Sequence, residues 1–376
     1  MSRLNGFLRG VRVLDLTRHL PGPLAALLLA DMGAEVLKIE APEGDGMRDM
    51  GPRRADGRSA YFTSVNAGKT TRTIDLKHPE GRAAFLDLVK TTDVLIESFR
   101  PDVMARLGVG YDGLQEINPR LIYCSLNGFG CTGPMAARAA HDLNYVSLAG
   151  ALPPVGPGGS LTDTPLADCA GGLFAALAIV GALHGRARAG RGCHLDLALV
   201  DAVMPLQILP LAALGAAGAA APPGEGLLNG GAACYHVYET SDGRRVTLAA
   251  LEAKFWRAFC AAAGRPDWEA QQGEPLPQRT LIAELTSMFR QLTLEECERR
   301  FGPADCCFAP VLELAQAVES AHVRSRGLVH RAADGELQPL FPALVDGEPP
   351  RPRPTLREHD PRARKSQGTN HKSQRT

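Results

Sequence analysis

Short apolar runs alternate with longer amphipathic segments through the first third of the chain. The run VRVLDL at 11–16 predicts a buried strand, and PGPLAALLLADMG at 21–33 predicts a helix with proline at its start and glycine at its end. A second strand-like run, AEVLKIE at 34–40, completes a βαβ unit, and the alternation returns over 71–99 and 120–130. This order predicts an α/β fold, in which a parallel sheet is flanked by helices and ligands bind at the carboxyl ends of the strands.

A change in composition after residue 200 predicts a second, smaller domain. Residues 201–232 are rich in Ala, Gly and Pro and are expected to link a large domain, 1–200, to a small α+β domain, 233–307. The small domain opens on two strand-like runs separated by SDG, which predicts a β-hairpin. Residues 308–348 are expected to return to the large domain. The basic, proline-rich segment 349–376 is expected to form a disordered tail.

Composition narrows the class of protein. The 376 residues hold 41 Lys and Arg against 41 Asp and Glu, so no overall field attracts nucleic acid. Two uncharged stretches, 169–183 and 202–224, are respectively too short and too broken by proline for membrane spans. The N-terminal segment lacks the apolar run of an export signal, which predicts a cytoplasmic location. The nine cysteines show no CxxC spacing, so we expect reduced thiols and no metal site.

The first βαβ unit resembles the start of a dinucleotide-binding domain, but its loop has the wrong sequence. The residues between strand and helix read TRHLPGP and contain no GxGxxG, which argues against NAD or FAD. Three cations, Lys38, Lys69 and Arg100, lie in or near this predicted sheet. Each alone could be a surface charge, whereas all three at one sheet edge would suit a phosphorylated ligand.

A carboxylate precedes a long apolar run of the chain. In TDTPLADCAGGLF, Thr164 fits a helix cap, Pro165 the first helical position, and Asp168 the first turn of a helix that ends near Gly185. The exposed amides and the helix dipole should stabilise Asp168 as an anion. Acidic residues are common in first turns for this reason alone, so the position by itself does not establish a function.

A histidine has a parallel setting at the start of a shorter helix. If Asp142 caps the helix LNYVSLA and Gly150 ends it, the imidazole of His141 stands at a positive helix end, which favours its neutral, proton-accepting form. A lone histidine could equally be structural. A neutral His and an ionised Asp are, however, the two forms that a pair of opposed bases requires.

Longer motifs carry a resemblance to a known family. GVRVLDLTRHLPGPLAALLLADMGAEVLKIEAP, DVLIESFRPDVMARLGVGYDGL, NPRLIYCSLNGFGCTGP and GRGCHLDLALVDAV resemble the class III CoA-transferases, the formyl-CoA transferase and carnitine dehydratase type. HDLNY, LADCAGG, NGGAACYHVY and ALEAKFW are similar to the α-methylacyl-CoA racemase branch. The resemblance runs from about Leu8 to about Val345.

The resemblance implies a reaction and a set of residues. A racemase or epimerase of 2-methylacyl-CoA thioesters would use His141 and Asp168 on opposite faces of the α-carbon, with Glu252 supporting the histidine. Such proton transfer passes through an enolate and needs no prosthetic group. For the enolate oxygen we expect the backbone N–H of Asp142 as donor, because it lies at a helix start.

The resemblance also implies how the substrate is held. Coenzyme A would be part of the thioester and not a prosthetic group, with Lys69 and Arg100 near its phosphates, Lys38 in the same cationic set, and Tyr145 near the thioester. An interlocked homodimer is implied, in which small-domain residues of one chain complete the site of the other.

Two other functions stay open. In a CoA-transferase, Asp168 would attack the thioester and carry the acyl group as a mixed anhydride, and His141 would not be needed. A catalytically silent acyl-CoA-binding protein would do neither.

Overall fold

The chain forms two compact units. The computed structural model describes residues 3–152 and 163–358 of the 376. The large unit comprises Met1–Gln207 and His322–Thr376, and the small unit comprises Ile208–Ala321.

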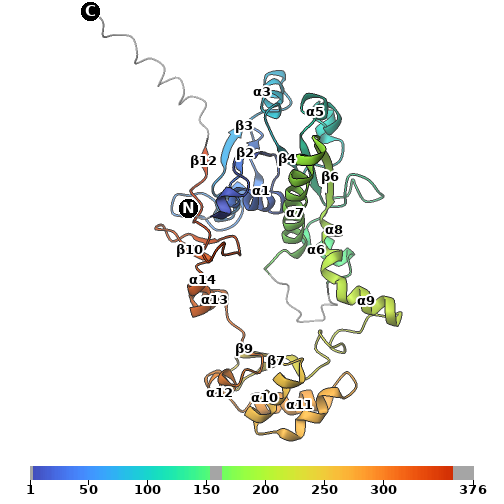
Figure 1. The fold of residues 1–376 in the computed structure, drawn as a ribbon, viewed down its shortest axis with the longest axis vertical. Helices are drawn as coiled ribbons and strands as arrows, with labels where there is room; N and C mark the ends of the chain where they lie inside the picture. The colour runs from blue at the N-terminus through green and yellow to red at the C-terminus, as the bar shows by residue number, and fades with distance from the viewer. Residues whose placement is uncertain (1–2, 153–162, 359–376) are drawn as a thin grey trace, which may run out of the picture. The chain divides into compact units, whose positions relative to one another are not determined.

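A seven-stranded parallel sheet forms the centre of the large unit (Figure 1). Its strand order is β12-β3-β2-β1-β4-β5-β6. Every residue of β5, sequence IYCSLN, is buried, as expected for a strand covered on both faces. The sheet confirms the predicted α/β class. The strands are β1 Arg12–Asp15, β2 Glu35–Glu40, β3 Thr70–Thr73, β4 Val94–Glu97, β5 Ile122–Asn127, β6 Cys193–Ala198 and β12 Arg357–Glu358.

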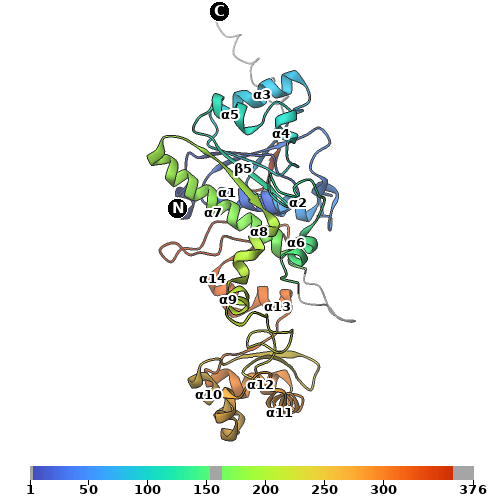
Figure 2. The ribbon, with the colours of Figure 1, turned by 90° about the vertical axis from the view of Figure 1, so that its right-hand side faces the viewer.

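Helices cover both faces of this sheet (Figure 2). On one face, apolar residues of α1, α6, α7 and α8 share a core with Val13, Ile96 and Leu126 of the strands. On the other face, α3, α4 and α5 pack around Leu14 and Leu95. The helices of the two faces are α1 Pro21–Asp31, α6 Asp142–Leu148, α7 Leu166–Ala189 and α8 Leu199–Val203, then α3 Pro79–Val89, α4 Val103–Arg106 and α5 Tyr111–Ile117. The other helices before Gln207 are η1 Arg3–Gly6, η2 Gly46–Asp49, α2 Ala60–Asn66 and η3 Met204–Gln207.

Two stretches are long and apolar enough to cross a membrane, judged by length and composition alone: α7 and Leu199–Ala217. α7 packs against α1 and α6 and buries Ala170, Ala175 and Ile179 in the core. Burial beside the sheet therefore accounts for one face of α7, whereas Leu173 and Leu177 are exposed.

The small unit is an antiparallel three-stranded sheet with helices packed on it. β7 Tyr235–Glu239 and β8 Arg245–Ala249 form the hairpin that the sequence predicts around SDG, and β9 Phe308–Pro310 pairs with β8. Aromatic side chains, among them Trp256, Phe259 and Phe301, fill its core. The remaining helices of this unit are α9 Ile208–Ala217, α10 Ala253–Ala263, η4 Pro266–Gly273, α11 Arg279–Phe289, α12 Leu294–Phe301, η5 Gly302–Ala304 and α13 Leu314–Glu319.

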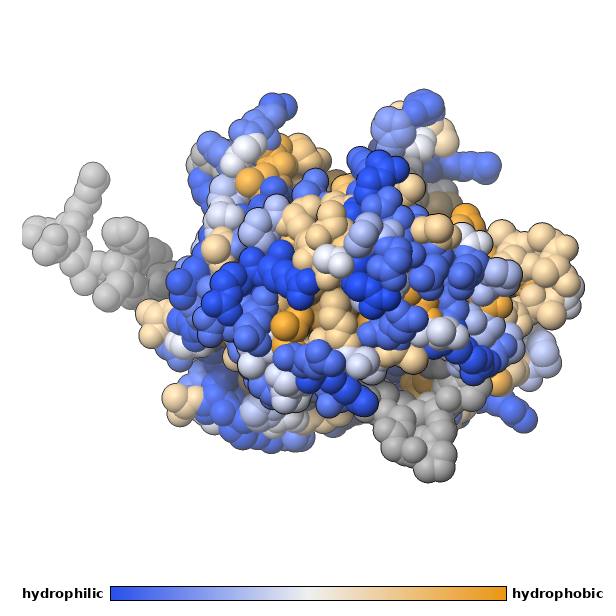
Figure 3. All heavy atoms as spheres, turned by 90° about the horizontal axis from the view of Figure 1, so that it is seen from below, coloured by the Kyte–Doolittle hydropathy of each residue, from blue (hydrophilic) through white to orange (hydrophobic). Residues whose placement is uncertain are grey.

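The segment 201–232 contains helices where the sequence analysis expects a linker. α9 forms because Leu and Ala have high helix propensity, and its Ile208, Leu209 and Leu214 are exposed. On the face of the molecule shown in Figure 3, hydrophilic residues are interspersed with patches of hydrophobic ones.

The expected disordered tail is wrong for residues 349–358, which pack against the large unit. The Arg353 guanidinium donates to both carboxylate oxygens of Asp31 at 2.7 Å, and Leu356 is buried. β12 then pairs with β3. The composition of the segment does not reveal this order, because the ion pair and the strand pairing are made with residues distant in the sequence. The rest of the expected tail, 359–376, lies outside the described residues. Residues 349–358 are preceded by α14 Ala321–Arg326 and by a hairpin of β10 Val329–Arg331 and β11 Leu337–Pro339.

Candidate active site

His141 and Asp168 line one cleft of the large unit. His141 is the residue before α6, and Asp168 is the third residue of α7. The cleft has a volume of about 540 Å³ and opens beside the carboxyl ends of β1, β4 and β5. Its lining includes Arg18, His19, Phe99, Arg100, Asn127, Arg138, His141, Asn144, Tyr145 and Asp168. The structure thus brings together the two residues that the sequence analysis pairs as bases.

The start of α6 differs from the sequence prediction by one residue. His141, not Asp142, is the N-cap; its backbone is extended, and its N–H donates to Oδ1 of Asn144 at 3.1 Å. The side chain of Asp142 is used elsewhere, since its Oδ1 accepts the backbone N–H of Asp168 at 3.0 Å. Because α6 also packs against α7, this bond fixes the two base-bearing segments to each other.

The carboxyl of Asp168 has an unusual proton affinity. Burial and, after it, the nearby Asp142 carboxylate raise its pKa from 3.8 to about 6, although His141 acts in the opposite direction. The sequence analysis expects an anion stabilised by the end of α7, and this expectation is wrong in direction. A helix dipole contributes little beside the loss of hydration of a partly buried carboxylate next to a second one.

Tyr145 lines the cleft, and its hydroxyl is already hydrogen-bonded within the protein. Its side chain is buried, its ring packs edge-on against Phe129, and its hydroxyl donates to the carbonyl of Ala140 at 2.7 Å. Burial, and then the charges of Asp168 and Asp142, raise the pKa of the hydroxyl. Its expected place near a thioester stays a prediction.

Of the three predicted cations, only Arg100 is available to a ligand. Arg100 is exposed in the cleft, and none of the described residues forms an ion pair with its side chain. Lys69 is fully buried, and its Nζ donates to Asp15, to the Pro23 carbonyl and to Asn66, each at 2.9 Å.

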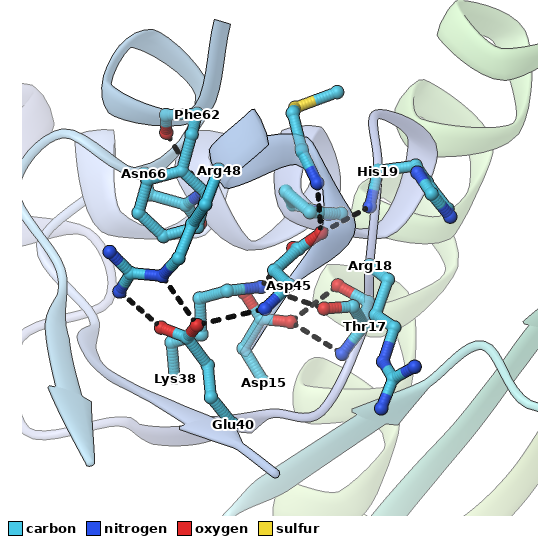
Figure 4. A network of polar contacts seen from close by, with 12 residues as sticks. Asp15, Thr17, Arg18, His19, Lys38, Glu40, Asp45, Arg48, Phe62 and Asn66 are labelled. Atoms are coloured by element: carbon cyan, nitrogen blue, oxygen red, sulfur yellow. Dashed lines mark hydrogen bonds and ion pairs between the residues drawn. The ribbon is translucent and has the colours of Figure 1, made fainter. Parts of the chain in front are cut away.

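The prediction that Lys38 contacts a ligand is also wrong, because its side chain is buried. It is 1% exposed, donates to the Thr17 carbonyl at 2.7 Å and lies 3.0 Å from the Asp45 carboxylate (Figure 4). Both lysines are therefore internal counter-ions of buried carboxylates. Burial lowers the pKa of Lys69 to about 8, while the pKa of Asp15, despite its own burial, is lowered to about 2 by Lys69 and Lys38.

This buried network holds the loop after β1 in place. Thr17 N–H donates to Asp15 at 3.0 Å, Arg18 N–H donates to the Ser98 hydroxyl at 3.1 Å, and His19 N–H reaches Asp45 at 3.4 Å. His19 has a φ of 63°, a left-handed conformation that is uncommon outside glycine. Successive backbone contacts thus present Arg18 and His19 to the cleft.

The sequence analysis missed Arg18, His19 and Arg138 as cleft residues. The imidazole of His19 lies edge-on to that of His141, with ring centroids 6.5 Å apart, and the Arg18 guanidinium lies over Phe99. The usable signal for the first two was their place in TRHLPGP, directly after a strand at the carboxyl edge of the sheet.

A second, mainly apolar pocket adjoins the cleft. Its volume is about 170 Å³, and it shares Arg18 and Phe99 with the cleft. Leu16, Ile39 and Leu76 line it, and Lys77 stands exposed at its edge.

Glu252 belongs to the small unit, where it is exposed at the N-cap of α10. Its expected role beside His141 stays a prediction. Over the described ranges 3–152 and 163–358, no group of three His, Cys, Asp or Glu side chains is placed to hold a metal ion.

Comparisons with known proteins cover nearly the whole chain. The family model for CoA-transferase family III matches residues 8–360. The chain is 33% identical over 347 residues to the α-methylacyl-CoA racemase of Homo sapiens, covering 91% of this chain and 87% of that protein. It is 33% identical over 357 residues to the acetyl-CoA:oxalate CoA-transferase of Acetobacter aceti, covering 92% and 91%. The crystal structure of a CAIB/BAIF family protein from Brucella suis is similar, with a TM-score of 0.81, 28% identity and coverage of 96% and 98%.

Proposed function

Because the chain belongs to CoA-transferase family III, we propose that it is a racemase or epimerase of 2-methylacyl-CoA thioesters that works by 1,1-proton transfer. The observation that carries the proposal is the meeting of His141 and Asp168 in one cleft. A transferase needs only the carboxylate, whereas an inversion needs two groups that exchange protons with one carbon.

The reaction follows from the two groups. The imidazole of His141 removes the α-proton of the thioester, and the electrons of that C–H bond move onto the carbonyl oxygen as an enolate. Asp168 then delivers its proton to the opposite face of the α-carbon, which inverts the centre; the reverse direction exchanges the roles. Positioned acid–base groups of this kind contribute roughly 10²–10⁴-fold in rate.

The proton affinity of Asp168 supports this role. With a pKa of about 6, roughly a tenth of Asp168 carboxyls are protonated at pH 7. An ordinary aspartic acid would almost never hold the proton that the second step requires.

The backbone N–H of Asp142 is our candidate for the enolate oxygen. Asp142 is the first residue of α6, so its N–H has no acceptor within that helix. A donor aimed at the developing oxyanion stabilises the transition state more than the ground state.

The CoA part of the substrate would bind through arginines. Arg18, Arg100 and Arg138 line the cleft, and guanidinium groups bind phosphate oxygens in pairs. The adjoining apolar pocket, with Lys77 at its edge, would take the adenine end.

We further propose that the protein is a homodimer. Analytical ultracentrifugation of the purified protein would test this by measuring its mass.

A CoA-transferase is the second candidate, because relatives of similar identity, 33% and 34%, carry that name. Here the Asp168 carboxylate would attack the thioester carbonyl and release the CoA thiolate, leaving a mixed anhydride of Asp168 and the acyl group. The thiolate would then attack the Asp168 carbonyl of the anhydride, which releases the donor carboxylate and leaves Asp168 as a CoA thioester. An acceptor carboxylate would run the same two steps in reverse and leave as the new CoA thioester.

One experiment separates the candidates. The protein is incubated in deuterated buffer with a panel of single-enantiomer 2-methylacyl-CoA esters, and α-deuterium and optical purity are followed by NMR and chiral chromatography. We expect deuterium gain with loss of optical purity. No exchange across the panel, together with movement of CoA to an added carboxylate, would refute the racemase proposal. Binding with neither exchange nor transfer would indicate a silent acyl-CoA-binding protein.

A further inference from the structure

The carboxylate of Asp142 has no part in the proposed reaction, yet it lies at the junction of the two base-bearing segments. Its Oδ1 accepts the backbone N–H of Asp168 at 3.0 Å. Its own backbone directly follows His141. One side chain therefore connects the start of α6, which carries the imidazole, to the first turn of α7, which carries the carboxyl.

This bond also holds a negative charge beside Asp168. After burial, Asp142 is the main cause of the raised pKa of Asp168. The same carboxylate contributes, behind burial and Asp168, to the raised pKa values of Tyr145 and Cys169. The pKa values of three groups, Asp168, Tyr145 and Cys169, are thus raised by the charge of Asp142.

A two-base racemase depends on how one proton is shared between its bases. One direction starts from a neutral imidazole and a protonated carboxyl, and the other from an imidazolium and a carboxylate. An ordinary aspartic acid and an ordinary imidazole differ by more than two pKa units, so the first state would be populated several hundredfold less than the second. A raised pKa of the Asp168 carboxyl makes this difference smaller.

We propose that Asp142 is a positioning residue that acts through Asp168: its carboxylate anchors the first turn of α7 and, by its charge, keeps the two single-proton states of the His141–Asp168 pair similar in free energy. This inference rests on the proposed racemase function.

Other groups near Asp168 do not replace Asp142. α8 also packs against α7, but its Asp201 does not line the cleft. Among the described residues, it is the Asp142 carboxylate that accepts the hydrogen bond from the Asp168 backbone N–H. The titratable and charged groups that face Asp168 or line its cleft, within the described residues, are Arg18 and His19 after β1, Arg100 after β4, Arg138 before α6, His141, Asp142 and Tyr145 at α6, and Cys169 on α7.

The test is the pH profile of kcat/KM for α-deuterium exchange in Asp142→Asn. The asparagine keeps an Oδ1 that accepts the Asp168 N–H and removes only the charge. Loss of the charge lowers the pKa of Asp168, so the acidic limb of the profile moves to lower pH. The maximum rate falls as well, about tenfold for each unit by which that pKa falls, because the state with a protonated Asp168 becomes rare.

Matched variants separate charge from structure. Asp112→Asn removes an exposed charge of α5 outside the cleft and is expected to leave the limb and the maximum unchanged. Asp142→Glu keeps the charge and should hold the limb close to that of the parent. An acidic limb that stays in place in Asp142→Asn, or a maximum that does not fall, would overturn the proposal.

A substrate-free measurement tests the role of Asp142 separately from the proposed function. Difference infrared spectroscopy follows the ionisation of the Asp168 carboxyl in the parent and in Asp142→Asn, with Asp168→Asn to assign the band. We expect its midpoint to be lower in Asp142→Asn. Equal midpoints refute the role of Asp142 even if the protein is a racemase, whereas a parent without exchange or inversion refutes the proposed function itself.

Discussion

The replacement of Lys69 by methionine tests whether this lysine is an internal counter-ion or a phosphate ligand. Lys69 and its partner Asp15 are both 0% exposed, and Lys69 Nζ to Asp15 Oδ2 is 2.9 Å. Methionine has a similar length and no charge, so Lys69→Met leaves a buried carboxylate with only Lys38 as a nearby cation.

The expected loss is large for a single substitution. Breaking a buried ion pair by removing one partner costs about 3–5 kcal/mol, because the remaining charge has lost its water without compensation. The second variant Asp15→Asn with Lys69→Met removes both charges, and it should recover part of this loss. Urea unfolding followed by circular dichroism measures the free energies.

Arg100→Met is the matched control, since it also replaces a long cation with methionine. Arg100 is exposed and is not ion-paired with any described residue. The unfolding free energy of the Arg100→Met variant should therefore differ from that of the parent by no more than about 0.5 kcal/mol. Its affinity for CoA should instead fall about 10- to 100-fold, the value of a charge-assisted hydrogen bond. Lys69→Met should bind CoA almost as the parent does at a temperature where it is folded. If Lys69→Met kept its stability and lost CoA affinity, the buried position of Lys69 would be wrong.

Three further predictions concern other parts of the large unit. His141→Ala should abolish α-deuterium exchange from one enantiomer without changing the unfolding midpoint; activity within a few-fold of the parent would contradict its role as a base. Because the pKa of Asp15 is lowered from 3.8 to about 2, its stabilising effect is complete above pH 3.8 and is lost as pH falls through 2, so carbon-13 NMR should show this carboxyl titrating below pH 3. Arg353→Met should destabilise the protein by about 3 kcal/mol in urea unfolding, because it leaves Asp31 buried without its partner; an unchanged midpoint would show that the pair contributes nothing.

Local sequence patterns predicted most of the large unit. The runs at 11–16 and 34–40 became β1 and β2, and PGPLAALLLADMG became α1. These features are readable because strand and helix formation depend on residues a few positions apart. The segment 349–358 was missed because its order depends on Asp31 and on β3, which lie more than 250 positions earlier in the chain.

The candidate site was predicted in part. The motifs pointed to His141 and Asp168, and the structure places both in one cleft. Lys38 and Lys69 were misread because a lysine at a strand end looks the same in the sequence whether it faces solvent or a buried carboxylate. The proton affinity of Asp168 was also misread, because the helix end is visible in the sequence, whereas the burial of the carboxyl and the neighbouring Asp142 carboxylate are not.

The amino-acid sequence by itself determined the order of strands and helices, the family and the identity of the two candidate bases, since each of these is written in short stretches of chain. Only the tertiary structure decided which cations remain free for a ligand and how tightly Asp168 holds its proton. Both properties depend on hydration and on charges within a few ångströms, and folding brings those charges from segments that are distant in the sequence.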